Sequence, residues 1–493
     1  MNSSSKEKDM KKQAILKLTL TFLIAAAALG TGCGQPGSTA TDPADYGDYA
    51  GTDGMIHVSA ESGSDTDGCG TEDSPFATLP CAAASLAPGR TIIVHDGTYD
   101  AFTLTETASG TEDAPVTIKA AEGESPVIKP TGDGDEVIGI HIVNAEHITI
   151  EGLEVEGGTH GIYYESTRDR GEMPLTDITI KDCTVHGVRG THGICVYACN
   201  DLAPVKDLTM TGCEVYDCEC GDSESTVFNG NIDGFEISGN LIHENNNIGI
   251  DMIGFEGNAA HPEGEGFDNL YDADYVRNGT CHDNVVYGIS AEGNDAYLED
   301  GEYDLCADGI YVDGGQDIEI YNNFVFCCDI GIEVATEHSP DDNPLFKVSG
   351  IDVHDNVVAG CEGWCGLCFG GYDADLGYTE NCKFYNNTFI DNDTQIGVQR
   401  SKDNEVYGNL LSGGSTGVEY NEDCRPEDLN GNAIHDNVAA GLEEKDSWQA
   451  AYGKTYKSTD ELLRGWTSRI EGCGSSFAPA EEYVKIYESW RED

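Results

Sequence analysis

The segment IEIYNNFV (318–325) is one of ten stretches of this chain that fit a single eight-residue template. Corresponding positions in successive stretches lie 22 to 44 residues apart. Strand-like units that repeat at such intervals, without a helical period, are typical of a β-solenoid. Seven of the ten carry Asn at the sixth position: Asn240, Asn284, Asn323, Asn356, Asn387, Asn409 and Asn437. An inward Asn on each coil can donate and accept hydrogen bonds along the stack, so we expect an asparagine ladder.

A second set of strands accompanies the ladder, and each begins with Gly followed by Ile, Leu or Val. Its members are GIYYE (161–165), GICVY (193–197), GIDMIG (249–254), GIYVDG (309–314), GIEVATE (331–337), GLCFGGYD (366–373) and GVEY (417–420). Because side chains alternate along a strand, we expect the aliphatic residue to point inward and the next residue outward. The outward face then carries Tyr163, Asp251, Tyr311 and Glu333 in one row and Tyr197 and Asp313 two residues further along.

The region before the ladder has a different pattern. It contains GSD, a G-T-x-x-x-P-F-x-T-L stretch, P-G-R-T-I-x-V and G-T-Y, carried by Gly63–Asp65, Gly70–Leu79, Pro88–Val94 and Gly97–Tyr99. This pattern resembles the N-terminal capping region of bacterial right-handed parallel β-helix proteins, including family-nine pectate lyases. The resemblance extends from about residue 55 to about residue 440. It implies an all-β, right-handed parallel β-helix, whose first sheet would carry the active site on its outer face.

The N-terminus has the layout of a signal peptide, with five lysines followed by the apolar run Leu18–Leu29, which is too short to span a membrane. LGTGCG (29–34) resembles a bacterial lipobox in which Cys33 is acylated, and cleavage by signal peptidase I is the alternative. We expect an exported protein held at the cell surface or by an outer-membrane lipid anchor, or else secreted. The expected segments are a signal peptide (1–32), a flexible tether (33–54), an N-terminal cap with the first coils (55–145), the β-helix (146–445) and a C-terminal helical cover (446–493).

The chain is strongly acidic. It contains 26 Lys and Arg against 90 Asp and Glu, a net charge of −64, which excludes nucleic acid as a partner and suits a saline environment. We expect a monomer.

Apart from Cys33, an even number of the 19 cysteines remains, and in an exported chain this favours disulfides. The expected pairs are Cys69–Cys81 and Cys183–Cys213, and the cluster Cys361, Cys365, Cys368 and Cys382 favours disulfides over zinc.

Five acidic residues form the candidate metal site: Asp251, Asp308, Asp313, Glu333 and Glu337. Like charges on neighbouring coils are unfavourable unless a cation bridges them or a pKa rises. Oxygen ligands of this kind suit Ca²⁺, whereas chance stacking of acids on an acidic surface is the alternative.

Two long insertions, 255–278 and 291–308, interrupt the repeat beside the acidic row. We expect them to wall a saccharide groove, and a pinned flap is the alternative. The candidate substrate-binding residues are Tyr163, Tyr197, Tyr311, Tyr271, Tyr275 and Tyr372. The candidate catalytic bases are His338, Arg277 and Arg400.

Three functions fit these features. The first is a Ca²⁺-assisted polysaccharide lyase that acts on a uronan by β-elimination. The second is a β-helix glycoside hydrolase with paired carboxylates, and the third is a non-catalytic glycan-binding or adhesive surface protein. In family-nine pectate lyases a Lys is the base and Asp residues hold Ca²⁺, but no segment of this chain matches that Asp-rich motif. The resemblance therefore points to the fold more strongly than to the lyase reaction.

Overall fold

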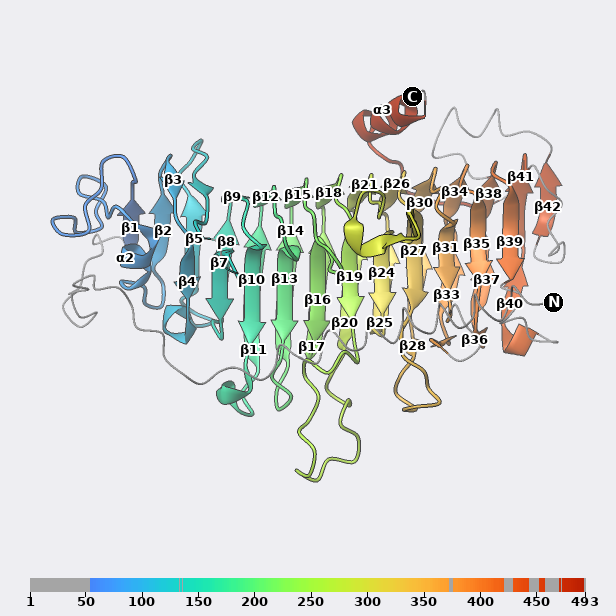
Figure 1. The fold of residues 1–493 in the computed structure, drawn as a ribbon, viewed down its shortest axis with the longest axis horizontal. Coiled ribbons are helices and arrows are strands. Elements are labelled where there is room, and N and C mark those ends of the chain that lie inside the picture. Colours follow the sequence, from blue (N-terminus) through green and yellow to red (C-terminus); the bar gives the residue numbers. More distant parts are fainter. Residues whose placement is uncertain are drawn as a thin grey trace. The chain divides into compact units, whose positions relative to one another are not determined.

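The structure is a computed structural model, and it describes residues 54–132, 134, 136–371, 376–420, 429–442, 452–456, 470 and 472–491. All of these belong to one compact unit, Gly47–Asp493. In this part of the chain three long parallel sheets run side by side as a β-helix, which confirms the expected fold class (Figure 1). The expected signal peptide, nearly all of the tether, and Cys33 lie outside the described residues, and the domain boundaries stay predictions.

Each coil contributes one strand to each long sheet, in chain order. The 16-stranded sheet consists of β1 (Met55–Val58), β2 (Thr91–Val94), β5 (Val116–Ala120), β8 (Ile148–Glu151), β11 (Leu175–Lys181), β14 (Val205–Thr211), β17 (Ile232–Ser238), β20 (Val276–His282), β25 (Gln316–Tyr321), β29 (Asp352–His354), β33 (Lys383–Tyr385), β37 (Glu405–Tyr407) and β40 (Ala433–His435), with β28 (Val348–Ser349), β32 (Thr379–Glu380) and β36 (Ser401–Lys402) off the main path. The 11-stranded sheet consists of β4 (Phe102–Leu104), β7 (Ile138–Val143), β10 (His160–Ser166), β13 (His192–Ala198), β16 (Thr226–Gly230), β19 (Ile250–Ile253), β24 (Asp308–Asp313), β27 (Ile330–Ala335), β31 (Cys365–Phe369), β35 (Thr394–Val398) and β39 (Thr416–Tyr420). The 13-stranded sheet consists of β3 (Thr98–Tyr99), β6 (Val127–Ile128), β9 (Glu154–Glu156), β12 (Thr184–His186), β15 (Glu214–Tyr216), β18 (Leu241–His243), β21 (Val285–Tyr287), β26 (Phe324–Phe326), β30 (Val357–Ala359), β34 (Thr388–Ile390), β38 (Leu410–Ser412), β41 (Asn437–Ala440) and β42 (Tyr452–Tyr456).

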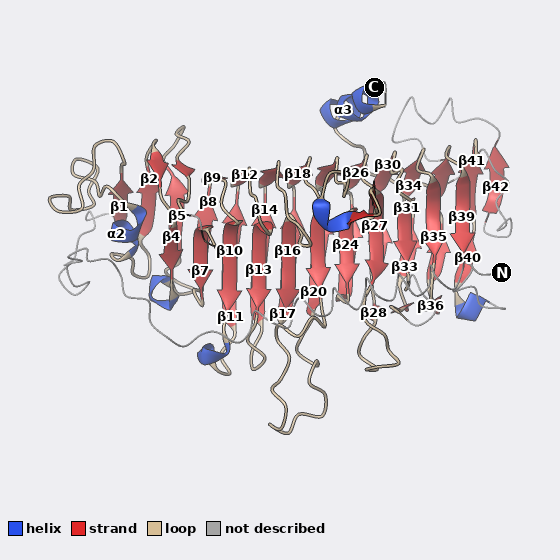
Figure 2. Cartoon of the chain, viewed as in Figure 1, coloured by secondary structure: helices blue, strands red, loops and turns tan. Residues whose placement is uncertain are grey.

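Helices are few in the described ranges (Figure 2). They are α2 (Leu79–Ala83), η3 (Glu106–Ala108), η4 (Arg168–Arg170), η5 (Asp295–Tyr297), η6 (Leu429–Gly431) and α3 (Glu481–Trp490), and a separate hairpin pairs β22 (Leu298–Glu299) with β23 (Glu302–Tyr303). Of the helices described here, none is long and apolar enough to cross a membrane.

The asparagine ladder is confirmed and lies at the turn between the 16-stranded and 13-stranded sheets. The backbone N–H and the side-chain amide of Asn284 both donate to Oδ1 of Asn323 at 3.0 Å, and Asn323 repeats this pattern with Asn356. The residue before each of these asparagines is left-handed, as in Asp283 (φ 54°) and Asn322 (φ 55°). Asn and Asp tolerate this conformation better than other non-glycine residues, which explains why the repeats carry them there.

Aliphatic stacks fill the interior. Ile194, Ile250, Ile310 and Ile332 are fully buried on strands of the 11-stranded sheet, as the alternation predicts. Full burial of such a side chain stabilises the fold by roughly 1.5–3 kcal/mol. The same register turns the following residue of each strand to the outer face.

The cysteines differ from expectation. The seventeen in the described ranges are free thiols, so the disulfides expected at Cys69–Cys81 and Cys183–Cys213 are not formed in this structure. Cys183 and Cys213 instead continue the ladder, because their thiols donate to the carbonyls of Ile150 and Ile180 at 3.7 Å, much as the amide of Asn284 donates to a backbone carbonyl.

The C-terminal segment also differs from expectation. Helix α3 lies within the expected helical cover and packs against the middle of the 13-stranded sheet (Figure 1). Tyr487 is buried there beside Phe326, and Trp490 meets Tyr287 edge-on at 5.8 Å. Strand β42, part of the expected helical cover, extends this sheet by pairing with β41.

Candidate functional site

One row of outward residues runs along the 11-stranded sheet. In register, its members are Thr103, His141, Tyr163, Cys195, Val227, Asp251, Tyr311, Glu333, Cys368, Gly397 and Glu419. The expected outward face is therefore confirmed, and the register adds Val227 and Gly397 to it. Asp251 and Glu333 lie two strands apart with Tyr311 between them, and Asp313 lies two residues further along β24.

Six carboxyl groups gather on this face and form what we call the acidic cluster: Glu224, Asp251, Asp308, Asp313, Glu333 and Glu337. Asp251, Asp308, Asp313 and Glu333 are 1, 3, 5 and 9% exposed, and the Glu224 side chain is 14% exposed. Glu337 is exposed and opens the cluster to solvent. Carboxyl groups that are buried this close together keep their protons at pH values where exposed carboxyl groups are ionised.

Asp308 and Glu333 form a hydrogen-bonded carboxyl pair. Burial, and then the charge of Glu333, raises the pKa of Asp308 well above its usual range. Burial raises the pKa of Glu333 to about 7, while hydrogen bonds from Asp308 and the Cys368 thiol limit that rise. At neutral pH Asp308 therefore keeps its proton and donates a hydrogen bond to the carboxyl group of Glu333, which is partly ionised.

Asp251 is the most buried acid of the row. Burial, and then the charges of Glu224 and Asp313, raises its pKa well above the usual range. Its Oδ1 and the Oδ1 of Asp308 are buried without a hydrogen-bond partner among the described residues. A neutral carboxylic acid at Asp251 tolerates that environment, whereas a carboxylate would not.

His338 lies at the open edge of the cluster. Burial alone would lower its pKa, but the hydrogen bond from Nε2 to Glu256 at 2.8 Å and the charges of Glu256, Asp313 and Glu337 raise the pKa to about 9. About one His338 in a hundred is then neutral at pH 7. The side chain is a cation in this arrangement and is poorly suited to act as a base.

The two candidate arginine bases are engaged elsewhere. Arg277 donates to Asn231 and to the backbone of Tyr275, both at 3.0 Å, and lies on β20 of the 16-stranded sheet. Arg400 pairs with Asp341 at 3.0 Å. Neither contacts the acidic cluster in the bonds that the structure records.

Five residues of the acidic cluster are also the predicted calcium site. In the described part of the chain, no three His, Cys, Asp or Glu side chains are arranged to hold a metal ion. Asp308 and Glu333 share a proton, whereas Ca²⁺ would require both as ionised ligands. Calcium binding by this cluster stays a prediction, and it would require these carboxyl groups to lose their protons.

The insertion 291–307 covers the N-terminal ends of β19, β24 and β27, and its helix η5 lies in front of them in Figure 2. Tyr297 lies near enough to Glu224 for that charge to raise its pKa, although burial is the larger cause. Burial chiefly raises the pKa of Cys306, which Asp308 and Glu333 also influence. This insertion thus keeps water from one side of the carboxyl pair.

The other insertion, 255–278, forms a small core of its own. Phe255 is buried, and Tyr275 packs against it at 5.4 Å between ring centroids. Tyr271 meets Phe346 edge-on at 4.9 Å. The predicted binding residues Tyr271 and Tyr275 therefore stabilise the loop, and Tyr372 lies outside the described residues.

Tyr163 and Tyr197 instead belong to an aromatic platform of five rings on β7, β10 and β13: His141, His160, Tyr163, His192 and Tyr197. Tyr163 stacks with His141 at 5.1 Å and with His160 at 5.4 Å, and meets Tyr197 edge-on at 5.8 Å. Tyr197 donates to Nε2 of His192 at 3.0 Å. The platform occupies the same face as the acidic cluster, toward the N-terminus.

Sequence reasoning missed Glu224, Glu256 and the platform histidines. Glu224 precedes β16, whose sequence TVFNG lacks the Gly-Ile start that marked the other strands. The ladder interval from Cys213 to Asn240 could have revealed this strand, because each coil needs one. Glu256 lies in an insertion, where no repeat predicts its position.

Two family models match the chain. One is described as "Pel9A-like, right handed beta helix region" and matches residues 56–291; the other is described as "Periplasmic copper-binding protein (NosD)" and matches residues 268–451. The chain is 35% identical over 395 residues to the uncharacterized protein YwoF of Bacillus subtilis, which covers 75% of this chain and 77% of YwoF.

Two further similarities are more limited. Pectate lyase PEL9 of Emericella nidulans is 33% identical over 144 residues, which covers 26% of this chain and 33% of that enzyme. The crystal structure of a GH136 lacto-N-biosidase from Eubacterium ramulus has a TM-score of 0.54 at 15% identity, covering 82% of this chain and 66% of that chain. The chain thus spans just under two thirds of that enzyme, and the likeness concerns the fold alone.

Proposed function

The chain belongs to the family of pectate-lyase-like, right-handed parallel β-helix proteins that includes YwoF, and on that basis we propose that it is a polysaccharide-active enzyme that hydrolyses glycosidic bonds with Asp251 and Glu333. The observation that carries the proposal is the pairing of a neutral buried acid with a partly ionised carboxylate on one sheet face. Glycoside hydrolysis requires two carboxyl groups, one protonated and one ionised, and different environments can hold two such groups in these two states.

The spacing of the two groups supports an inverting reaction. Asp251 and Glu333 are separated by the strand that carries Tyr311, so their backbones lie about 10 Å apart. Carboxyl groups about 6.5–9.5 Å apart leave room for a water molecule beside the sugar. A sugar bound over Tyr311 would face both groups.

Asp251 gives its proton to the glycosidic oxygen as the bond to the anomeric carbon breaks. Glu333 accepts a proton from the water whose oxygen bonds to that carbon, and the product is a new reducing end. Asp308 acts as a positioning residue, because its proton holds Glu333 as a carboxylate. The exposed Glu337 side of the cluster is the approach that remains open to substrate.

Product chemistry tests the proposal. The mature chain, screened against polysaccharides, is expected to release reducing ends without unsaturated products. Asp251→Asn and Glu333→Gln should each lower turnover by at least about 100-fold. Glu319→Gln, an exposed acid on the 16-stranded sheet, is the matched control and should have no effect. Unsaturated products, or full activity in both site variants, would rule out hydrolysis by this pair.

A uronan lyase is the second candidate, and the similarity to pectate lyase PEL9 over 144 residues favours it. It would need a base at C5 and a group that neutralises the uronate. The three candidate bases are paired with Glu256, Asn231 and Asp341. Absorbance of an unsaturated product that depends on Ca²⁺ would select this candidate, and glycan binding without turnover would select a non-catalytic surface protein.

We also propose that the chain is exported and held at the outer membrane through Cys33. The signal-peptide layout supports export, and the matching model of a periplasmic protein family agrees with it. Cys33→Ala should release the protein from the membrane fraction without changing its activity. Retention of the Cys33→Ala protein in that fraction would refute the lipid anchor.

A further inference from the structure

Resting on the proposed function, we infer that the site takes an uncharged glycan, which lies across the strands of the 11-stranded sheet with several sugars over the aromatic platform. Three features of this sheet favour such a ligand: its strands carry no Lys or Arg, His160 and His192 are neutral, and a hollow lies at the far end of the same row.

The first feature is charge. The eleven strands of this sheet contain no Lys or Arg, whereas the strands of the 16-stranded sheet carry Lys119, Lys181, Lys206, Arg277, Lys383 and Lys402. The arginines that follow β10 and β35 are bound to acids, Arg168 to Asp201 at 2.7 Å and Arg400 to Asp341 at 3.0 Å. Among the described residues of this face, a polyanionic chain would meet carboxyl groups and cations already bound to acids, His338 bound to Glu256 included, at separations that salt screens little.

The second feature is the neutral state of the platform. Burial lowers the pKa of His160 to about 4 and that of His192 to about 3. His192 uses Nδ1 to donate to the backbone oxygen of Glu224 at 3.0 Å, which leaves Nε2 as the acceptor for Tyr197. His160, His192 and the two tyrosines therefore present uncharged rings, ring nitrogens and hydroxyls. These groups suit the C–H faces and hydroxyls of a neutral sugar and give an anion no partner.

The platform is also physically joined to the acidic cluster. Glu224, which accepts the His192 hydrogen bond through its backbone, is the largest charge acting on Asp251. In register, Tyr163 is followed by Cys195, Val227 and then Asp251. A glycan lying on Tyr163 and Tyr197 thus continues, three strands or about 14 Å further, onto the proposed acid.

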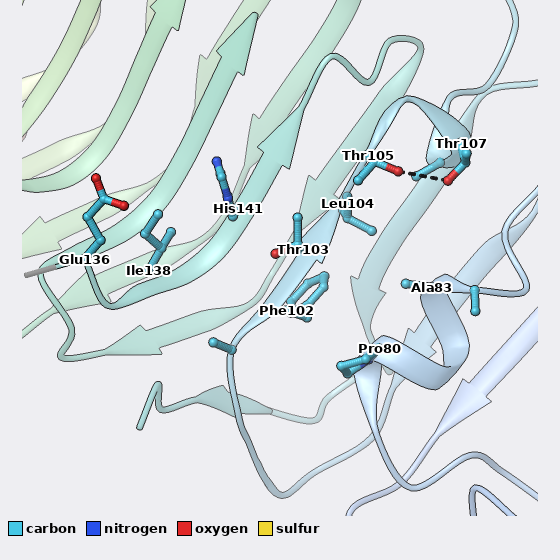
Figure 3. A pocket seen from close by; sticks show the side chains of 13 residues that line it. Pro80, Ala83, Phe102, Thr103, Leu104, Thr105, Thr107, Glu136, Ile138 and His141 are labelled. Carbon is cyan, nitrogen blue, oxygen red and sulfur yellow. Dashed lines mark hydrogen bonds between the residues drawn. The ribbon is translucent and has the colours of Figure 1, made fainter. Parts of the chain in front are cut away.

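The third feature is a hollow of about 610 Å³ beyond the platform, lined by residues of α2, β4 and β7 (Figure 3). Thr103, Thr105 and His141 line it, and Thr103 and His141 are the first two members of the outward row. Glu136 also lines it, but none of the six acids of the acidic cluster does, so its place is at the end of a binding path, and threonine hydroxyls suit an uncharged sugar.

Binding measured without turnover tests the inference. The Glu333→Gln variant of the mature chain is titrated with neutral oligosaccharides (xylo-, manno-, cello- and chito-oligosaccharides) and with oligogalacturonate and oligomannuronate, at low and high salt. We expect at least one neutral series to bind and neither uronate to bind at either salt concentration. Tyr163→Ala and Tyr197→Ala should each weaken binding about tenfold. Tyr385→Ala, in a ring stack on the 16-stranded sheet, is the matched control and should leave binding unchanged.

A variant that gains binding keeps the experiment informative even if the tyrosine variants fail to fold. Glu165 accepts hydrogen bonds from His141 and Tyr163 and remains partly exposed, so Glu165→Lys should recruit oligogalacturonate that the parent does not bind. Uronate binding by the parent would overturn the substrate class and leave hydrolysis by Asp251 and Glu333 standing. Neutral binding that ignores both tyrosine variants would overturn the platform, and absence of all glycan binding would overturn both the platform and the substrate class.

Discussion

Replacement of Glu333 by Gln should stabilise this protein at alkaline pH and leave its stability at acidic pH almost unchanged. Burial raises the pKa of Glu333 in the folded state to about 7, against an ordinary value of 4.5. The folded state therefore holds this proton more tightly than the unfolded state between these two values. Its stability falls as pH rises through that window, and the loss is complete above pH 7.

The magnitude follows from the width of the window. A difference of one in pKa corresponds to 1.36 kcal/mol, so the rise from 4.5 to about 7 amounts to about 3 kcal/mol at pH 8.5 and almost nothing at pH 4.5. A Gln side chain has similar volume and carries no charge, so it escapes this penalty. Because Glu333 is 9% exposed, solvent screening reduces the effect only slightly.

Urea denaturation followed by tryptophan fluorescence, at pH 4.5, 6.0, 7.0 and 8.5, measures the difference between Glu333→Gln and the parent chain. Glu112→Gln, at an exposed position, is the control and should behave like the parent at every pH. Equal stabilisation at pH 4.5 and 8.5 would refute the reasoning, because a packing effect does not titrate. Destabilisation at pH 8.5 would refute it more directly.

Three further predictions follow from named contacts. Cys368→Ala removes a thiol hydrogen bond that lowers the pKa of Glu333, so the acidic limb of the kcat/KM profile should move up by about one pH unit, whereas Cys368→Ser should keep it in place. Asn323→Ala leaves the amides of Asn284 without their acceptor and should lower the free energy of unfolding by at least about 3 kcal/mol in urea denaturation. EDTA should leave hydrolytic activity unchanged, and activity that EDTA abolishes and Ca²⁺ restores would reinstate calcium as the cofactor.

The stack of coils could be predicted because the same local sequence features recur in each coil. Asn at the ladder position and a left-handed residue before it are local requirements, and they recur wherever a coil turns. The prediction failed where the local marker was absent. Strands β16 (TVFNG) and β35 (TQIGV) lack the Gly-Ile start, so Val227 and Gly397 were missing from the expected outward row. In register, Val227 lies between Cys195 and Asp251.

The acids of the site were located from the sequence, but their chemistry was not. The alternation rule placed Asp251, Tyr311 and Glu333 on the outer face, where the register confirms them. Whether such acids bind a cation or share protons depends on burial and on partners from distant coils. Glu224 reaches Asp251 from the segment before β16, and Cys368 reaches Glu333 from the following strand, β31.

The sequence by itself determined the β-helix, its ladder and the face that carries the acids, because these depend on short-range periodicity and on residues that only a turn or a core position accepts. The tertiary structure alone decided which carboxyl groups are buried, which pair shares a proton, and which basic side chains are already bound. Those properties are set by desolvation and by contacts between coils 20 or more residues apart. No local pattern encodes them, since the same Asp on a less covered coil would be an ordinary carboxylate.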